Sequence, residues 1–316
     1  MDVMTTTQLF EKAGTVTPGT TTKRGRFAIA GLLVVTAAWG STFTILKDVT
    51  TRIPAADYLT WRFALATAVL AALRPRGVVA MPTALRRKAL LLGLVFGVAN
   101  LLLTVGLTST SASVSGFLTA TYVIFTPLLT AALFREHLRR QVWTATAVAA
   151  VGLAVLSTHG GGGTGSTTGA ALTLAGAALF AVHIVGLGAW SHPRYAVEMA
   201  VYQAGMTALV SAVAAIPGGI EVPRTSADRF GLIYMAVMVS ALTMLVQTWA
   251  QSRIHPAQAA IVMTFEPVWA AGFPRVKGRS PLARRMLWTT PRAAPSWPKR
   301  TPNLPITSCS EMPQSR

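Results

Sequence analysis

Charged residues are scarce in this sequence of 316 residues: they make up 12% of the chain, and only 10 of them are acidic. A soluble globular domain carries about 25% charged residues, so half that share leaves too little polar surface to cover a soluble fold of this length. Residues 91–134 contain no Asp, Glu, Lys or Arg at all. The scarcity of charge excludes a soluble globular protein and indicates an integral membrane protein.

Motifs for metal binding, nucleotide binding and catalysis are also missing. The single cysteine, Cys309, cannot form an internal disulfide, and the five histidines show no HExxH spacing. The Gly-rich stretch at 159–169 lacks the GK[ST] that a phosphate-binding loop needs. We therefore expect no cofactor, no metal and no enzymatic activity.

What the chain does contain is long apolar runs. Residues 27–46 carry no charge over 20 positions, which is long enough to cross about 30 Å of hydrocarbon as a helix. Breaks at charges, Pro and Gly predict nine helical segments, at 27–46, 57–73, 89–108, 112–134, 141–157, 169–190, 196–217, 230–250 and 254–273. Residues 1–26 are expected to form a polar cytoplasmic tail, and 158–168 a flexible Gly-rich linker.

Basic residues give the chain a formal net charge of +18. A nucleic-acid partner is one reading of such a charge, but basic residues of a membrane protein mostly mark its cytoplasmic loops. With the N-terminus inside, the inner loops hold 13 Lys or Arg and the outer loops four. The sequence therefore predicts a multi-pass protein of the cytoplasmic membrane with a cytoplasmic N-terminus, and no nucleic-acid partner.

Two alignments of the chain with itself indicate an internal repeat. A shift of 141 residues places Trp39 on Phe180, Asp57 on Glu198, Trp61 on Tyr202 and Arg62 on Gln203. A shift of 144 residues places Tyr122 on Glu266. If residues 27–157 form a first repeat of five helices, an odd number, the second repeat at 169–273 must enter the membrane upside down. Inverted repeats are common in secondary transporters, which bind substrate near the bilayer midplane between the halves.

The C-terminal residues 274–316 break the pattern of the rest of the chain. The repeat predicts a tenth helix near 285–301, but that stretch holds three prolines and four basic residues, which a lipid-spanning helix does not tolerate. We interpret this basic, Pro-rich tail as aberrant, the product of a frameshift, truncation or annotation error. The alternative is a genuine basic tail on a nine-helix protein.

Ionisable side chains within predicted membrane helices are candidates for a functional site, because placing them there costs several kcal/mol. Arg62 could extend toward the membrane interface with Asp57 as its partner, or present its planar guanidinium to a substrate carboxylate or phosphate. Glu266 could couple transport to protons, or be a protonated acid bonded to a neighbouring helix. His183 could act as a gate or proton relay, or be a core histidine with its hydrogen bonds satisfied.

Uncharged polar and aromatic side chains complete the candidate substrate pathway. Asn100, Tyr122, Gln203 and Gln247 could hydrogen-bond a substrate, although such residues also join helices to each other. Trp39 and Trp61 could line a cavity, and anchoring at the membrane interface is an alternative for Trp61. The glycines Gly93, Gly97 and Gly106 are expected to allow close helix approach.

Several segments together resemble the EamA-type transporters of the drug/metabolite transporter superfamily. They are "AAWGSTFTILKDV" from Ala37, "DYLTWRFALATAVLAAL" from Asp57, "TSASVSGFLTATYVIFTPLLTAALFREHL" from Thr110 and "PAQAAIVMTFEPVWAA" from Pro256. The resemblance runs from about residue 27 to 273. It implies ten helices in two inverted five-helix repeats, and export or exchange of small metabolites or drug-like compounds across the cytoplasmic membrane.

By position, Trp39, Arg62, Tyr122 and Glu266 match recurrent residues of that family, and Glu136 matches its acidic loop between helices four and five. Two features depart from the family pattern: Val123 stands where a proline is usual, and the second repeat lacks its acidic loop and tenth helix. The second departure puts transport competence in question.

Three functions therefore compete at this stage: a secondary transporter, a non-transporting remnant of one, and a membrane scaffold or enzyme. The expected partners are the lipid bilayer and a small-molecule substrate. A homodimer is left open by the sequence.

Overall fold

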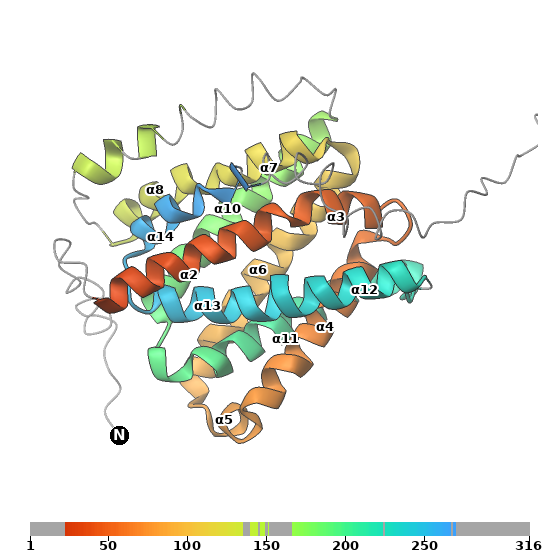
Figure 1. Cartoon of the computed structure of the whole chain (residues 1–316), viewed down its shortest axis with the longest axis horizontal. Helices are drawn as coiled ribbons and strands as arrows, with labels where there is room; N and C mark the ends of the chain where they lie inside the picture. Colours follow the sequence, from red (N-terminus) through yellow and green to blue (C-terminus); the bar gives the residue numbers. More distant parts are fainter. Residues whose placement is uncertain are drawn as a thin grey trace, which may run out of the picture.

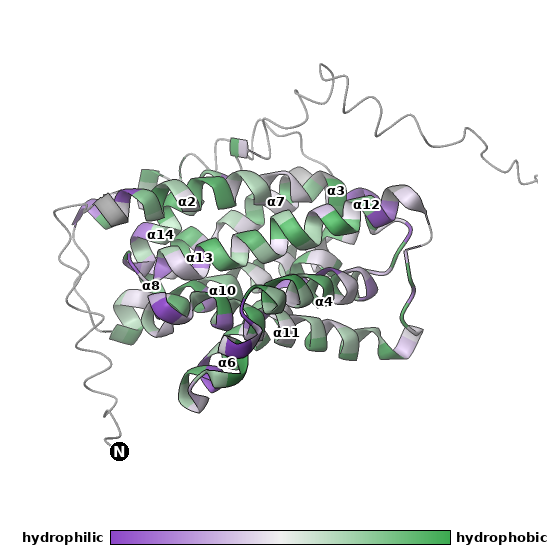
Figure 2. Cartoon of the chain, turned by 60° about the horizontal axis from the view of Figure 1, so that its bottom comes forward, coloured by the Kyte–Doolittle hydropathy of each residue, from purple (hydrophilic) through white to green (hydrophobic). Residues whose placement is uncertain are grey.

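The computed structural model describes residues 23–134, 140–144, 146–148, 151, 166–223, 225–266 and 268–269. Within these ranges every regular element is a helix (Figure 1). Six stretches there are long and apolar enough to cross a membrane: Gly25–Val49, Thr83–Ser109, Val114–Phe134, Thr167–Trp190, Pro193–Gly218 and Asp228–Gln251. Figure 2 shows hydrophobic residues along these helices and hydrophilic ones gathered mainly at their ends. The predicted class, an all-α integral membrane protein, is confirmed.

Short connections join the described helices, apart from the stretch between residues 134 and 167. In chain order they are α2 (Lys23–Gly40), α3 (Thr42–Val49), α4 (Ala55–Leu73), α5 (Pro75–Ala80), α6 (Thr83–Ser109), α7 (Ala112–Ala120), α8 (Tyr122–Phe134), α10 (Thr167–Trp190), α11 (Ala196–Ala215), α12 (Ser226–Tyr234), the π-helical η3 (Met235–Leu242), α13 (Thr243–Gln251) and α14 (Pro256–Met263). Two 3₁₀ turns, η1 (Pro193–Tyr195) and η2 (Ile216–Gly218), flank α11.

The observed bounds depart from the predicted ones in several places. Helix α6 begins at Thr83 rather than 89, so its basic residues lie in the first turns of the helix and not in a loop. Helix α5 was not predicted, and α10 begins at Thr167, inside the expected linker. Helix α2 also begins at Lys23, so the last four residues of the predicted N-terminal tail are helical. Residues 1–22, most of the predicted fifth helix, most of the linker and the whole C-terminal tail from 274 lie outside the described residues, so the predictions about them stay predictions.

Four of the long helical segments are interrupted, and a hydroxyl side chain accompanies three of the interruptions. Ser41 separates α2 from α3, and its Oγ donates to the Ala38 carbonyl at 2.7 Å. Thr121 separates α7 from α8 and bonds the Leu118 carbonyl at 2.6 Å. Thr264 follows α14 and bonds the Ile261 carbonyl at 2.6 Å. Hydroxyls that bond back to a carbonyl one turn earlier compete with the helical ladder and bend it. The fourth interruption is the π-helical η3 between α12 and α13.

The two repeats run in opposite directions, as helices α4 and α11 show. These helices are equivalent under the 141-residue shift, and they pack side by side. Trp61 on α4 bonds the Glu221 carbonyl beyond the end of α11, whereas Arg74 after α4 pairs with Glu198 at the start of α11. The N-terminal end of each helix therefore lies at the C-terminal end of the other.

Two further contacts between the repeats are related to each other by the same symmetry. Helix α6 packs on α10, and α13 packs on α2. In both pairs the third helix of one repeat packs against the first helix of the other repeat. Figure 1 shows α2 and α13 lying alongside one another. The arrangement agrees with two inverted halves that share one core.

Glycines let α6 approach its neighbours closely. A Cβ atom at Gly93 would lie 2.7 Å from the Gln203 backbone, and one at Gly106 would lie 2.7 Å from the Gly169 carbonyl. Only a residue without a side chain fits at such distances. The expectation that these glycines serve helix approach is confirmed.

The loops gather at two opposite ends. At one end Arg74 pairs with Glu198, the Tyr202 hydroxyl donates to the Val78 carbonyl, and Lys88 lies over the Trp190 ring. This end carries the loops that the sequence assigns to the cytoplasm.

At the other end Lys47 Nζ donates to the carbonyls of Leu107, Thr108 and Thr110, at 2.6, 3.0 and 2.8 Å. A cation there satisfies carbonyls that the end of α6 leaves without partners. This end carries the loops assigned to the outside.

Candidate functional site

A cavity of about 60 Å³ lies in the shared core, between the interrupted helices. Its wall combines residues from both repeats. Seven of the nine side chains predicted for the substrate pathway line it: Trp39, Arg62, Asn100, Tyr122, His183, Gln247 and Glu266. The structure therefore brings together residues from seven helical segments: α2, α4, α6, α8, α10, α13 and the stretch that holds Glu266.

Arg62 is the cation of this cavity. Its side chain is buried, with 6% of its surface exposed, and its Nε donates to Ser240 Oγ on η3 at 2.6 Å. The guanidinium carbon lies 5.1 Å from the centre of the Phe63 ring. Among the described residues no carboxylate forms an ion pair with it.

The alternative reading of Arg62, as a side chain that reaches the interface with Asp57 as its partner, is wrong. Asp57 instead accepts a hydrogen bond from the Glu221 amide at 2.9 Å. The reason is directional: the two residues lie on one helix, but Asp57 points to the loop beyond α11 while Arg62 points into the core. The charge of Arg62 is thus left without a counter-ion in the described structure.

Glu266 is the acid of the cavity and is bonded to Tyr122. The Tyr122 hydroxyl lies 3.0 Å from Glu266 Oε2 and 3.0 Å from the Met263 carbonyl. Both residues sit at interruptions, Tyr122 after the break at Thr121 and Glu266 after the turn at Thr264. The second repeat's interruption thus supplies both a free carbonyl and a carboxylate to one tyrosine of the first repeat.

His183 lies on α10 and is fully buried beside the Phe96 ring, 4.8 Å between ring centres. Its Nε2 is 2.8 Å from Gln203 Oε1, so Gln203 stands behind the histidine and does not line the cavity itself. Nδ1 of His183 has no hydrogen-bond partner in the described part of the chain.

Three further candidates each form a hydrogen bond within the protein. Trp39 lines the cavity and its Nε1 donates to Thr243 Oγ1 at 3.2 Å. Asn100 lines it too, with its Nδ2 bonded to the Phe96 carbonyl of its own helix. Trp61 is 37% exposed at the end of the bundle and bonds the Glu221 carbonyl. It lies outside the cavity wall, in agreement with the interfacial alternative.

Several lining residues were not singled out by sequence reasoning. They are Ser240 and Thr243 from the η3–α13 region, Met244, and the rings of Phe63 and Phe96. Serines, threonines and phenylalanines occur on every face of membrane helices, so composition gives no signal for them. The π-helical turn that faces Ser240 toward Arg62 has no sequence signature either.

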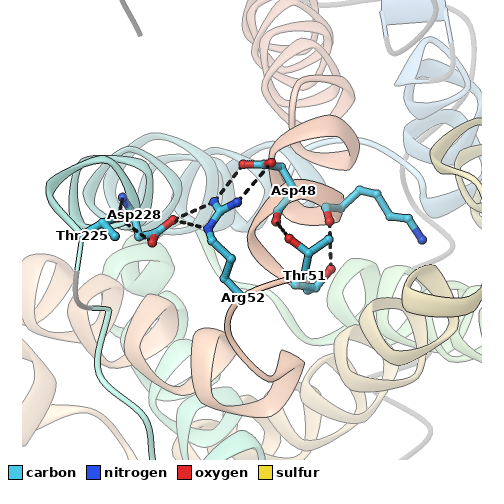
Figure 3. A network of polar contacts seen from close by, with 7 residues as sticks. Asp48, Thr51, Arg52, Thr225 and Asp228 are labelled. Carbon is cyan, nitrogen blue, oxygen red and sulfur yellow. Dashed lines mark hydrogen bonds and ion pairs between the residues drawn. The ribbon is translucent and has the colours of Figure 1, made fainter. Parts of the chain in front are cut away.

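A polar network closes the end of the bundle that carries Lys47 (Figure 3). Arg52 bonds Asp48 at 2.9 Å and Asp228 at 2.8 Å, and so ties α3 to the start of α12. Thr225 caps α12: its hydroxyl accepts from the Asp228 amide and donates to the Asp228 carboxylate. The hydrogen bonds to Asp48 and then to Asp228 raise the pKa of Arg52 above its ordinary value.

Comparisons with known proteins agree with this architecture. Residues 26–158 match the EamA-like transporter family. A protein of Archaeoglobus fulgidus described as an uncharacterized transporter is 25% identical over 248 residues, which is 77% of this chain and 76% of that protein. A solved protein crystal structure, 18% identical, matches with a TM-score of 0.64 over 83% of this chain and 93% of that one. This last likeness shows the fold alone. Residues 26–158 thus belong to the EamA-like transporter family, and the protein is a multi-pass membrane transporter of helical fold.

Proposed function

We propose that the protein is a secondary transporter that exports or exchanges small metabolites or drug-like compounds bearing an anionic group. The observation that carries this proposal is the guanidinium of Arg62, which forms no ion pair with any described carboxylate and lies in a cavity walled by both inverted halves. Transport takes place across the cytoplasmic membrane, with the N-terminus and the basic end of the bundle inside.

The position of Arg62 explains why the ligand would be anionic. A buried charge without a counter-ion costs several kcal/mol, and a carboxylate or phosphate of the ligand would offset that cost. The guanidinium is planar and presents parallel N–H groups that match both anions. Nε is already bonded to Ser240. The two terminal nitrogens have no hydrogen-bond partner among the described residues, so they are the ones that would bind the anion.

Alternating access would use the inverted halves and the breaks between their helical segments. The breaks at Ser41, Thr121 and Thr264 lie at residues next to the cavity wall, where interrupted helices can hinge and bind ligands. Pockets for drug-sized ligands usually measure about 300–1,000 Å³, so a cavity of about 60 Å³ represents a closed arrangement. Rocking of one half against the other would widen it toward either end.

Transport assays on the purified full chain in proteoliposomes test the proposal. Carboxylates, phosphates and their neutral analogues are first screened for thermal stabilisation, and stabilising compounds are then tested for counterflow. Arg62→Gln should reduce flux of anionic compounds about ten- to a hundredfold, the worth of a charge-assisted hydrogen bond. Arg86→Gln, at the exposed first turns of α6, serves as the matched control and should transport normally. Undiminished flux in Arg62→Gln would refute the anionic substrate.

The same assay separates the alternatives. The proline-rich sequence at 285–301 favours a non-transporting remnant. Such a remnant would fold and show no flux with any compound, and a variant given an apolar tenth helix would regain flux. An enzyme would show turnover in detergent without sealed vesicles. We propose that it shows none.

A further inference from the structure

We infer that Gln203 is a positioning residue that holds His183 in a single tautomer, so that the cavity presents a hydrogen-bond acceptor as well as the donors of Arg62. The ligand would therefore carry an anionic group together with an O–H or N–H donor. This inference rests on the proposed function, because it describes the chemistry of a ligand in that same cavity.

The orientation of the Gln203 amide follows from its neighbours. The Met199 carbonyl, which can only accept, lies 3.2 Å from Gln203 Nε2. Thr248 Oγ1 donates its own proton to the Met244 carbonyl at 2.7 Å, so it too accepts from Gln203 Nε2, at 3.4 Å. A flipped amide would place its oxygen against two acceptors. The amide nitrogen of Gln203 therefore faces away from the histidine.

The amide oxygen of Gln203 is what faces His183. Because Oε1 can only accept, the atom 2.8 Å from it, His183 Nε2, must carry the proton. In a neutral imidazole the other nitrogen then holds a lone pair. Two main-chain carbonyls thus set the tautomer of His183. The Met199 carbonyl accepts from Gln203 Nε2 directly, and the Met244 carbonyl takes the proton of Thr248, which makes Thr248 Oγ1 an acceptor as well.

The lone pair on Nδ1 has no donor in the described part of the chain, although the atom is fully buried. The imidazole lines the same cavity as Arg62 and Gln247, and Gln247 Nε2 is likewise buried without an acceptor. Buried polar groups left without partners cost free energy. One ligand with an anion, a donor and an acceptor would satisfy all three.

Glu266 already accepts a hydrogen bond from Tyr122 at Oε2, whereas His183 Nδ1 is a buried acceptor with no donor at all in the described part of the chain. His183 is therefore the group we assign to selecting for a donor on the ligand. A site built around a hydrogen bond rejects an analogue that lacks it, because its own polar group is then left unpaired.

The tautomer is tested directly by long-range proton–nitrogen NMR on the full chain labelled with ¹⁵N-histidine. The His183 signals are identified by their loss in His183→Gln. The wild type should show a protonated Nε2 and a bare Nδ1. Gln203→Leu should give a mixture of tautomers, while His192, which lies outside the cavity, stays unchanged. A protonated Nδ1 in the wild type would overturn the inference without bearing on transport.

The ligand chemistry is tested with 3-phenyllactate and 3-phenylpropionate, two carboxylates that differ by one hydroxyl donor. The wild type should bind 3-phenyllactate about tenfold more tightly, the worth of one hydrogen bond. His183→Gln keeps a donor toward Gln203 but has no nitrogen at the Nδ1 position, and should bring that ratio to about one. The control Arg86→Gln should keep the ratio.

Two results would contradict the ligand assignment. One is an equal affinity for both compounds in the wild type, and the other is a ratio that survives in His183→Gln. If neither compound binds, the anionic ligand fails together with the proposed function, whereas the NMR result still decides the tautomer. Melting temperatures of His183→Gln and Gln203→Leu distinguish lost selectivity from lost folding.

Discussion

Tyr122 and Glu266 are hydrogen-bonded to each other and 144 residues apart, and 144 is also the shift at which their segments align. Equivalent positions of two inverted repeats meet only where the pseudo-two-fold axis passes between them. The axis therefore runs through the cavity, between the break at Thr121 and the turn at Thr264. At this point the repeats have different side chains, a donor on one and an acceptor on the other, so the equivalent residues bond instead of repelling.

Replacement of Tyr122 should therefore weaken the closed arrangement. Tyr122→Phe leaves the buried Glu266 carboxylate and the Met263 carbonyl without their donor, at a cost of about 1–3 kcal/mol. A lower melting temperature in detergent would report it. Glu266→Gln retains an amide oxygen that accepts from the Tyr122 hydroxyl, so its melting temperature should fall less. A greater loss in Glu266→Gln than in Tyr122→Phe would contradict this reading.

The Arg52 network should depend on Asp228 more than on Asp48, because the side chain of Asp48 is 69% exposed and that of Asp228 is 5% exposed. Exposed ion pairs contribute about 0–1 kcal/mol, whereas a charge-assisted bond to a buried carboxylate contributes about 1.5–3 kcal/mol. A double-mutant cycle of Arg52→Gln with Asp228→Asn should show the larger coupling. The matched cycle with Asp48→Asn is the comparison, and equal couplings would argue against the burial effect.

Close packing at Gly93 should be intolerant of even one methyl group. In Gly93→Ala the new Cβ would lie 2.7 Å from the Gln203 backbone and 2.8 Å from Met206 Cβ. Overpacking of this kind typically costs about 1–3 kcal/mol, and here it would also shift the residue that orients His183. Gly231→Ala, with open space around its Cβ position, is the control and should be neutral or slightly stabilising.

The proposed orientation is open to a labelling experiment, since the only native cysteine is Cys309. In a Cys309→Ser background, single cysteines at the exposed positions Thr51 and Glu221 should react with a non-permeant thiol reagent on intact cells. Cysteines at Arg76 and His192, exposed at the opposite end, should react only after permeabilisation. The reverse pattern would invert the assignment, and a mixed pattern would contradict the grouping of loops into two ends.

Much of the site could be read from the sequence because ionisable groups in an apolar helix are conspicuous. Arg62, His183 and Glu266 stood out on that ground, and all three line the cavity. Trp61 was selected as one of two tryptophans that could wall a cavity, yet it lies at the end of the bundle. A tryptophan fits lipid headgroups and protein cavities equally well, so residue type does not decide between them.

The helix bounds were predictable where an apolar run ends at charges and prolines, and less so where a helix extends beyond the membrane. Helix α6 continues through Arg86, Arg87 and Lys88 because nothing there breaks the backbone ladder. The interruptions at Ser41 and Thr121 were not predicted. At both positions a hydroxyl hydrogen-bonds a backbone carbonyl one turn earlier. Most hydroxyls in these helices form such a bond without a break, so the residue type does not predict the interruption.

The amino-acid sequence alone indicated an integral membrane protein, and it predicted which segments cross the bilayer and that the two halves are related by inversion. The first two conclusions follow from the cost of placing charge in hydrocarbon. The inversion follows from the odd number of helices in the predicted repeat, and none of these arguments needs coordinates. Only the tertiary structure decided that Arg62 has no counter-ion among the described residues, that Gln203 stands behind His183, and that Tyr122 bonds Glu266. These helices are apolar all round, so their sequences do not say which face turns inward, and the rotation of each helix is settled by packing against the others.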